Sequence, residues 1–494
     1  MSAVTVTDDA EDVVHPFGID AATGRPLSGL TDEVVTALLG GGHEALYRTG
    51  AVALALGARG ENGEEHFALR DEGDTDPNNL AEAGWGILYG PGVGADIKKA
   101  LQPLIDRRRA EAKPLVIFEP EDFVPGEDAY QWLKRHKVSL NVVNPALGVP
   151  YYLMIVASPD AIPFEFQYVL DLYWAVGRVW FDTPDEFGRY AQSVVDYEKA
   201  EQVAARRHIA LFAPEHDFDA ATQLFTRQVA QPLCGVSSGG GVETVLGARM
   251  KYTLQPFLGE TATKQHLTDI YCGASPGGRP ALLFSGGHGM QFNHGDALQL
   301  NTQGALVCQD WDRTGEITAK DWFAAADLPG DAQVHGLIQF MFACHGGGVP
   351  QFDNFDRLGG QPRRIAPGPF FSKLPQALLA HRNGGALAVV AHIERAWAYS
   401  FQGDGGLPQV QGFRNVLSRI LAGQRIGEAM DTFNINWAAI AARLSEAQLA
   451  RERDPSLSVR PIGRLWVQRD DARNFMVFGD PAVRLRVKEM AAQV

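Results

Sequence analysis

The sequence predicts an α/β fold in which a mainly parallel β-sheet is flanked by helices. Short apolar runs at 114–120 and 151–159 alternate with amphipathic stretches such as 96–112. Strands that are buried on both faces read as continuous apolar runs, and stretches with helical periodicity supply the layers that cover them. The alternation restarts at 208–214, after a long amphipathic stretch at 184–207. This restart predicts two tandem α/β subdomains.

We place the boundary between the subdomains near residue 205. Residues 1–20 are expected to be a flexible N-terminus, residues 21–205 the first subdomain, with its first strand at 51–60, and residues 206–494 the second. The second subdomain continues the same alternation, with helices expected at 219–233 and 371–382, strands at 280–287, 336–344 and 385–393, and a closing strand and turn at 465–485.

The composition excludes several classes of protein. The chain has 44 basic and 59 acidic residues, a net charge of -15 and no dense Lys/Arg run, which argues against nucleic-acid binding. Its four cysteines are far apart and form no CxxC pair, so neither a disulfide framework nor a thiolate zinc site is indicated and a reducing cytoplasm is expected. The acidic N-terminus and the absence of an apolar run of about 18 residues predict neither export nor a membrane span.

Two reactive side chains follow predicted strands. His288 ends "LLFSGGH", and Cys344 ends "IQFMFAC" 56 positions later. Either residue alone is more often structural, as a turn histidine or a core cysteine. Because the carboxyl ends of neighbouring parallel strands meet at one edge of a sheet, we expect the two side chains to lie together. We therefore predict Cys344 as nucleophile and His288 as general base, with the N–H groups of Gly289 and Cys344 as an oxyanion hole.

These residues resemble the caspase and gingipain superfamily of cysteine endopeptidases, and the gingipain branch with its bacterial relatives most. The similarity rests on "LLFSGGHGM", "FMFACHGGGVPQFDNF" and the closing "VFGDPAVRL", and extends from about residue 150 to the end. It implies a caspase-like fold, with a noncatalytic subdomain at 21–205 and a catalytic one at 206–494. It also implies hydrolysis of protein or peptide substrates through a Cys-His dyad, without a cofactor. Phe342–Gly346 departs from the Gln-Ala-Cys-Arg-Gly of caspases, so their substrate preference is not implied.

The resemblance also indicates where substrate specificity is decided. The loop after the first strand of the catalytic subdomain contributes to the primary pocket in this superfamily, and here it carries Asp217 and Asp219. An acid at this place implies cleavage after Arg or Lys, although Asp219 equally suits a helix N-cap. Asp310, Trp311 and Trp397 follow other strands and are candidates for the cleft walls, while tryptophan is also an ordinary packing residue.

Two other functions stay open. A noncatalytic scaffold would keep the fold and bind partners, and a metal-dependent hydrolase would use His288 and His294, whose spacing matches no recurrent metal-binding pattern. His345 is expected at the mouth of the site or in solvent, because adjacent residues at a strand end point opposite ways. Nothing in the sequence identifies the physiological substrate, the activator or the oligomeric state.

Overall fold

The computed structural model describes residues 15–29, 76–138, 143–236, 243–313, 316–358, 361–403 and 407–490. The strand expected at 51–60 lies outside these residues.

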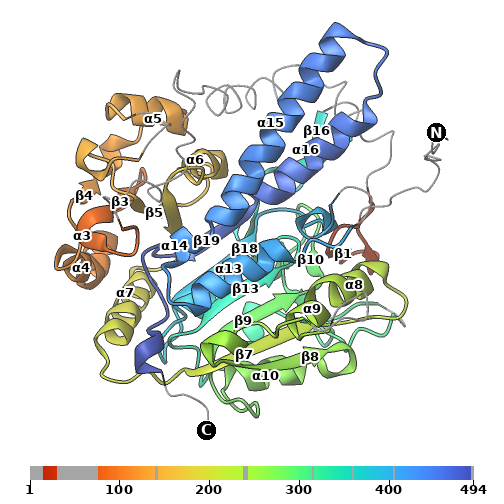
Figure 1. Cartoon of the computed structure of the whole chain (residues 1–494), viewed down its shortest axis with the longest axis horizontal. Helices are drawn as coiled ribbons and strands as arrows, with labels where there is room; N and C mark the ends of the chain where they lie inside the picture. The colour runs from red at the N-terminus through yellow and green to blue at the C-terminus, as the bar shows by residue number, and fades with distance from the viewer. Residues whose placement is uncertain are drawn as a thin grey trace, which may run out of the picture.

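Ten strands form one sheet, which Figure 1 shows running through the middle of the molecule. Their order across the sheet is β4 (Leu115–Phe118), β3 (Trp85–Tyr89), β5 (Tyr152–Val156), β6 (Ala175–Val179), β19 (Phe475–Gly479), β18 (Ala388–His392), β13 (Ile338–Phe342), β9 (Pro280–Gly286), β7 (Arg206–Ala213) and β8 (Thr253–Leu258). All neighbours are parallel except β18 and β19, which are antiparallel. The predicted mainly parallel sheet is confirmed. It has two halves whose strands run in opposite directions.

Helices flank the sheet, as predicted. They are α3 (Leu80–Ala83), α4 (Ala95–Arg109), α5 (Ala129–Arg135), α6 (Phe164–Leu170), α7 (Pro184–Lys199), α8 (Ala220–Phe225), α9 (Gln231–Leu233), α10 (Lys264–Tyr271), α11 (Gln299–Thr302), α12 (Lys373–Leu379), α13 (Gln411–Leu421), α14 (Ile426–Ala429), α15 (Asp431–Arg453) and α16 (Arg460–Arg473). In Figure 1, α13 crosses one face of the sheet, and α15 and α16 form a long pair that extends beyond it. Within the described ranges, no helix is long and apolar enough to cross a membrane.

Local sequence explains where the elements begin and end. Helix α7 starts at a capping box, in which Thr183 and Glu186 satisfy each other's backbone N–H groups, and Pro184 occupies the first turn. A π-helical turn at 226–230 joins α8 to α9, so the helix expected at 219–233 is continuous in space. The predicted boundary near residue 205 falls between α7 and β7, and the division into subdomains stays a prediction.

The closing segment at 465–485 corrects the sequence analysis. Its first part is not a strand but the end of α16, because Ile462, Leu465 and Trp466 recur with helical spacing and are buried together. Strand β19 follows and lies between the two halves of the sheet, pairing with β6 at Arg178 and with all five residues of β18.

The N-terminal residues are a second correction. Residues 15–20, which were expected to be flexible, contain β1 (Gly18–Asp20), and β2 (Arg25–Pro26) pairs with it. These strands belong to a small sheet with β10 (Gly289–Gln291), β11 (Leu306–Val307) and β12 (Trp322–Phe323), next to the second half of the main sheet and not in the first subdomain. Ile19 holds them there, because it is fully buried in an apolar cluster with Met290 and Trp311. Figure 1 shows β1 beside β10, far from the helices of the first subdomain.

Candidate active site

The pairing of β9 with β13 places His288 and Cys344 just beyond the ends of two neighbouring strands. Phe342 is the register partner of Gly286, and each chain continues two residues further to Cys344 and to His288. Both side chains are buried, with exposed fractions of 0% for Cys344 and 1% for His288. The two strand ends therefore lie side by side at the carboxyl edge of the second half of the sheet, and the pairing of the two side chains as a dyad stays a prediction.

A third side chain completes the group. The carboxylate of Asp219, which follows β7, lies 2.8 Å from His288 Nε2. The same oxygen accepts the Thr222 N–H at 2.9 Å and so caps α8. Burial alone would raise the pKa of Asp219, but the charge and hydrogen bond of His288, with the Thr222 bonds, hold it below its ordinary value. The other ring nitrogen of His288, Nδ1, is buried and has no hydrogen-bond partner.

The Cys344 thiol lies against the loop that follows β18. The Ala396 N–H donates to Sγ at 3.2 Å, and Sγ lies 3.6 Å from the Ala396 carbonyl oxygen. Burial raises the pKa of the thiol to about 12, while the Ala396 bond acts in the opposite direction. With its side chain buried in this way, Cys344 is a neutral thiol.

Two backbone N–H groups converge beside the thiol. Those of Cys344 and Gly289 donate to the same oxygen, the carbonyl of Phe17, at 2.9 Å and 3.0 Å. They are the two groups that the sequence analysis nominates as an oxyanion hole. Two donors aimed at one oxygen are the arrangement that stabilises negative charge on a carbonyl oxygen during acyl transfer.

The glycines around His288 make this convergence possible. A Cβ on Gly289 would lie 2.0 Å from the Cys344 carbonyl oxygen, so only glycine lets the two backbones come this close. A Cβ on Gly286 would lie 1.9 Å from the ring of Phe225, which therefore occupies the space that the glycine leaves.

The Phe17 side chain is fully buried in an aromatic part of the main core, with an exposed fraction of 0%. Its ring centroid lies 4.9 Å from that of Phe342, 5.7 Å from Phe401 and 6.0 Å from Phe225, each in an edge-to-face arrangement. Sequence analysis did not single out Phe17, Phe225 or Phe401, because nothing in their flanking residues distinguishes them from ordinary core phenylalanines.

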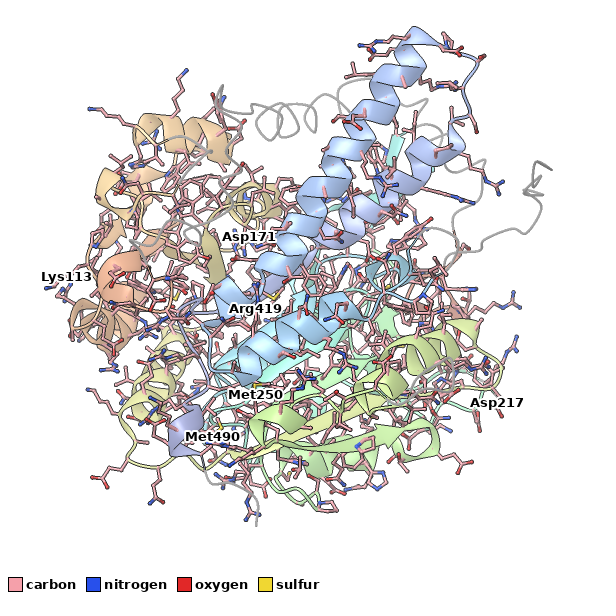
Figure 2. The ribbon with its side chains drawn as sticks, in the orientation of Figure 1. Lys113, Asp171, Asp217, Met250, Arg419 and Met490 are labelled. Carbon is pink, nitrogen blue, oxygen red and sulfur yellow. The ribbon has the colours of Figure 1, made fainter. Side chains whose placement is uncertain are left out.

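The predicted substrate-binding residues are scattered. Asp219 is bonded to His288, as described above, and its predicted role in the pocket stays untested. Asp217 is exposed at the surface before α8 (Figure 2), and the exposed Asp310 accepts the Lys264 N–H at 2.7 Å. Trp311 is buried with its ring centroid 6.5 Å from that of His288, and the fully buried Trp397 stacks edge-on against Phe355 at 5.2 Å.

His345 is not at the mouth of the site, contrary to expectation. It is 1% exposed, its Nε2 lies 3.1 Å from Gln291 Oε1, and its backbone N–H donates to the Glu394 carbonyl. A positive φ of 58° turns the chain sharply after Cys344 and directs this side chain inward. Burial lowers the pKa of His345 to about 3, so the ring is neutral.

No metal site appears where the structure describes the chain. No group of three or more His, Cys, Asp or Glu side chains is placed there to hold an ion, and His294 is exposed whereas His288 is buried against Asp219.

No protein-family model matches the chain, and no curated protein matches its sequence. Two solved structures are similar. A protease structure is 15% identical, with a TM-score of 0.48 over 82% of this chain and 80% of that chain. The complex of the pro- and mature domains of RgpB from Porphyromonas gingivalis is 11% identical, with a TM-score of 0.43 and the same coverage. The second protein is a gingipain, the branch that the sequence motifs resemble. Similarities of this size do not bear on the reaction, so the chemistry has to come from the residues of this chain.

Proposed function

We propose that the chain is a cysteine endopeptidase in which Cys344 is the nucleophile and His288 the general base. The observation that carries this proposal is the convergence of the Gly289 and Cys344 N–H groups on one carbonyl oxygen, directly beside the thiol. A thiol, an imidazole, a carboxylate on that imidazole and a paired donor site are the parts that acyl transfer needs.

The reaction begins when His288 takes the thiol proton and Sγ attacks the carbonyl carbon of the scissile bond. The N–H groups of Gly289 and Cys344 stabilise the oxyanion that forms, and His288 returns the proton to the departing amine. Water then hydrolyses the thioester, with His288 again as the base. The Ala396 N–H, 3.2 Å from Sγ, stabilises the thiolate in each half of the cycle.

Asp219 orients the base in this scheme. Its carboxylate accepts the Nε2–H of His288 at 2.8 Å, which leaves the unpartnered Nδ1 as the nitrogen that exchanges the proton with Cys344. The predicted preference for Arg or Lys rested on Asp219 as a pocket acid. Because this carboxylate is engaged by His288, we assign it to the positioning of the base and no longer to the substrate.

The cytoplasmic location stays part of the proposal. All four cysteines of the chain are free, and a reducing compartment would keep the Cys344 thiol available for attack. The noncatalytic scaffold is the alternative, and it predicts that the thiol never reacts.

The two functions are separated by comparing wild type with Cys344→Ala and with His288→Ala on a peptide library. Each substitution should abolish cleavage, and the double variant should be no worse than either single one, because the two side chains act as one unit. A fluorogenic signal that survives in Cys344→Ala, or a wild type whose Cys344 is never labelled by a peptide acyloxymethyl ketone, would exclude the thiol mechanism. Cys272→Ala, at a partly exposed cysteine away from the site, is the control.

A further inference from the structure

The residues that occupy the site belong to the chain itself. We propose that residues 15–20 are a built-in substrate of this enzyme and that Cys344 cleaves the bond between Phe17 and Gly18. This inference rests on the proposed function, and it adds a processing site, a state of latency and a substrate preference.

The residues before the bond pair with the loop that follows β18. The Phe17 N–H donates to the Ala396 carbonyl at 2.8 Å, and the Ala398 N–H donates to the His15 carbonyl at 3.2 Å. Between them, Pro16 and Trp397 form an antiparallel bridge. Main-chain pairing of an extended peptide with an exposed strand edge is a common way to bind peptides of many sequences.

The scissile bond lies at the reacting groups. The Phe17 carbonyl oxygen already accepts both donors, from Gly289 and from Cys344, and the next residue, Gly18, lies against the thiol. A Cβ at residue 18 would be 3.0 Å from Cys344 Sγ and 2.6 Å from a methyl group of Leu27, so a larger side chain there would press on the thiol and displace Leu27. This is the placement of a peptide bond that awaits attack.

The residues after the bond are held independently. Strand β1 pairs in parallel with β10 from Gly18 to Asp20, and the Leu27 N–H donates to the Gly18 carbonyl at 2.9 Å. Since Ile19 is fully buried below this pairing, the bond is fixed from both sides. Because the bond is already positioned beside Cys344, its cleavage does not incur the translational and rotational entropy loss of binding a separate substrate.

The rings around Phe17 define the preferred substrate. Phe225, Phe342 and Phe401 present aromatic edges to the Phe17 ring, and the His288 ring lies 5.9 Å from it. Because His288 already engages Asp219, a guanidinium or ammonium group among these rings would lose its hydration and would have to compete with His288 for that carboxylate, which is costly. We therefore infer cleavage after phenylalanine, in protein or peptide substrates, and not after Arg or Lys.

The step itself is balanced by groups that are present. Sγ of Cys344 forms a thioester with the Phe17 carbonyl carbon, the bond to the Gly18 nitrogen breaks, and His288 transfers the thiol proton to that nitrogen. Water hydrolyses the thioester and gives Phe17 a free carboxylate. Until then the segment fills the cleft, so the uncleaved chain is latent. Afterwards the peptide that ends at Phe17 can leave, while the new N-terminus at Gly18 starts β1.

The experiment follows the intact mass and the N-terminal sequence of freshly purified full chain over time, at several dilutions. Wild type should be converted to a chain that begins Gly18-Ile19-Asp20, at a rate that does not depend on protein concentration, and Cys344→Ala should stay intact. A rate proportional to concentration would overturn the intramolecular placement. A new N-terminus elsewhere would overturn the assignment of the bond.

Two variants test the role of Phe17 and the latency. Phe17→Arg should slow self-cleavage by at least roughly 100-fold, whereas Ala22→Arg, which adds the same charge at an exposed position of the same segment, should be cleaved like wild type. Gly18→Val should keep its own N-terminus but cleave a His-Pro-Phe-aminocoumarin reporter without the lag that wild type shows. Equal rates of self-cleavage for the two arginine variants would refute the binding of the Phe17 side chain as the specificity determinant. A lag that persists in Gly18→Val would refute residues 15–20 as an inhibitor.

The reporter separates this inference from the proposed function. Wild type that cleaves the reporter through Cys344 while its own Phe17–Gly18 bond stays intact would overturn self-processing and leave the peptidase standing. A protein that cleaves neither, and in which Gly18→Val is also inactive and unlabelled by the acyloxymethyl ketone, would overturn both.

Discussion

Asp219→Asn is the substitution that separates the two roles of this residue most cleanly. The side chain keeps its size, and asparagine is as good an N-cap as aspartate, so the Thr222 N–H at the start of α8 retains its acceptor. What is lost is the negative charge 2.8 Å from His288 Nε2. The variant therefore reports on the orientation and charge balance of the base with little change in local structure.

The size of the effect follows from this one contact. A hydrogen bond to a buried charged group contributes about 1.5–3 kcal/mol, roughly twice a neutral one. Because asparagine keeps the accepting oxygen and loses only the charge, about half of this is lost from the transition state, and kcat/KM falls by about 4- to 13-fold. Since the carboxylate is hydrogen-bonded to the base, His288, the loss should appear in kcat, with KM changed little.

The assay compares kcat and KM of the mature enzyme on phenylalanine and arginine reporters. Asp217→Asn is the matched control, because Asp217 is two residues away and exposed. If Asp219→Asn stays within threefold of that control, the positioning role is refuted. If it raises KM for arginine reporters alone, Asp219 returns to the specificity pocket where the sequence analysis placed it.

Stability provides a second readout of the same substitution. The folded-state pKa of Asp219 lies below its ordinary value, so its contribution to stability is present above the unfolded pKa and is lost as the pH falls through the folded one. Asp219→Asn should therefore lower the melting temperature at pH 7, and the difference should shrink below about pH 4. A difference that grows in acid would contradict the stabilising hydrogen bond between Asp219 and His288.

Two further predictions concern stability. Burial lowers the pKa of His208 and of His216 to about 4. Below the ordinary value of 6.5 these rings bind protons in the unfolded chain but not in the folded chain, so each ring lowers the free energy of unfolding by about 1.4 kcal/mol per pH unit. Urea unfolding of His208→Gln between pH 7 and pH 5 should therefore show a smaller pH dependence by one ring's contribution, and an unchanged pH dependence would contradict this. The Asp480 carboxylate binds the buried Arg108 at 2.7 Å and the Trp85 indole N–H at 2.9 Å. Asp480→Asn should therefore lower the free energy of unfolding by about 3 kcal/mol, whereas Asp182→Asn at the exposed pair with Lys373 should lower it by less than about 1 kcal/mol. Equal losses in urea unfolding would refute the buried network.

Much of the fold is readable because its signals are local. The strands β5, β9 and β13 are apolar runs bounded by Gly or Pro, and helices such as α7 carry caps and a buried stripe. The place of β19 is different. It lies between β6 and β18 because of pairings with residues that are about 300 and 90 positions away, and no periodicity in its own sequence encodes such a choice of neighbours. Reversal of direction between the two sheet halves has the same origin.

The site divides along the same line. His288 and Cys344 could be nominated because each follows an apolar strand by two residues and lies close to glycines, and the parallel register of the two strands places them at one edge of the sheet. The role of Asp219 as a helix N-cap was foreseen, but its hydrogen bond to His288 was not, since an acid that caps a helix gives no sign of what else its oxygen will accept. Phe17 was missed for a deeper reason. His15-Pro16-Phe17-Gly18 has no periodic pattern, and its conformation is imposed by Ala396, Gly289 and Cys344, which are distant in sequence. A peptide that binds as substrate is selected by the cleft, so its structure is a property of the cleft's residues and not of its own. That dependence is why exchange of Phe17 should alter processing while the fold of the second sheet half persists.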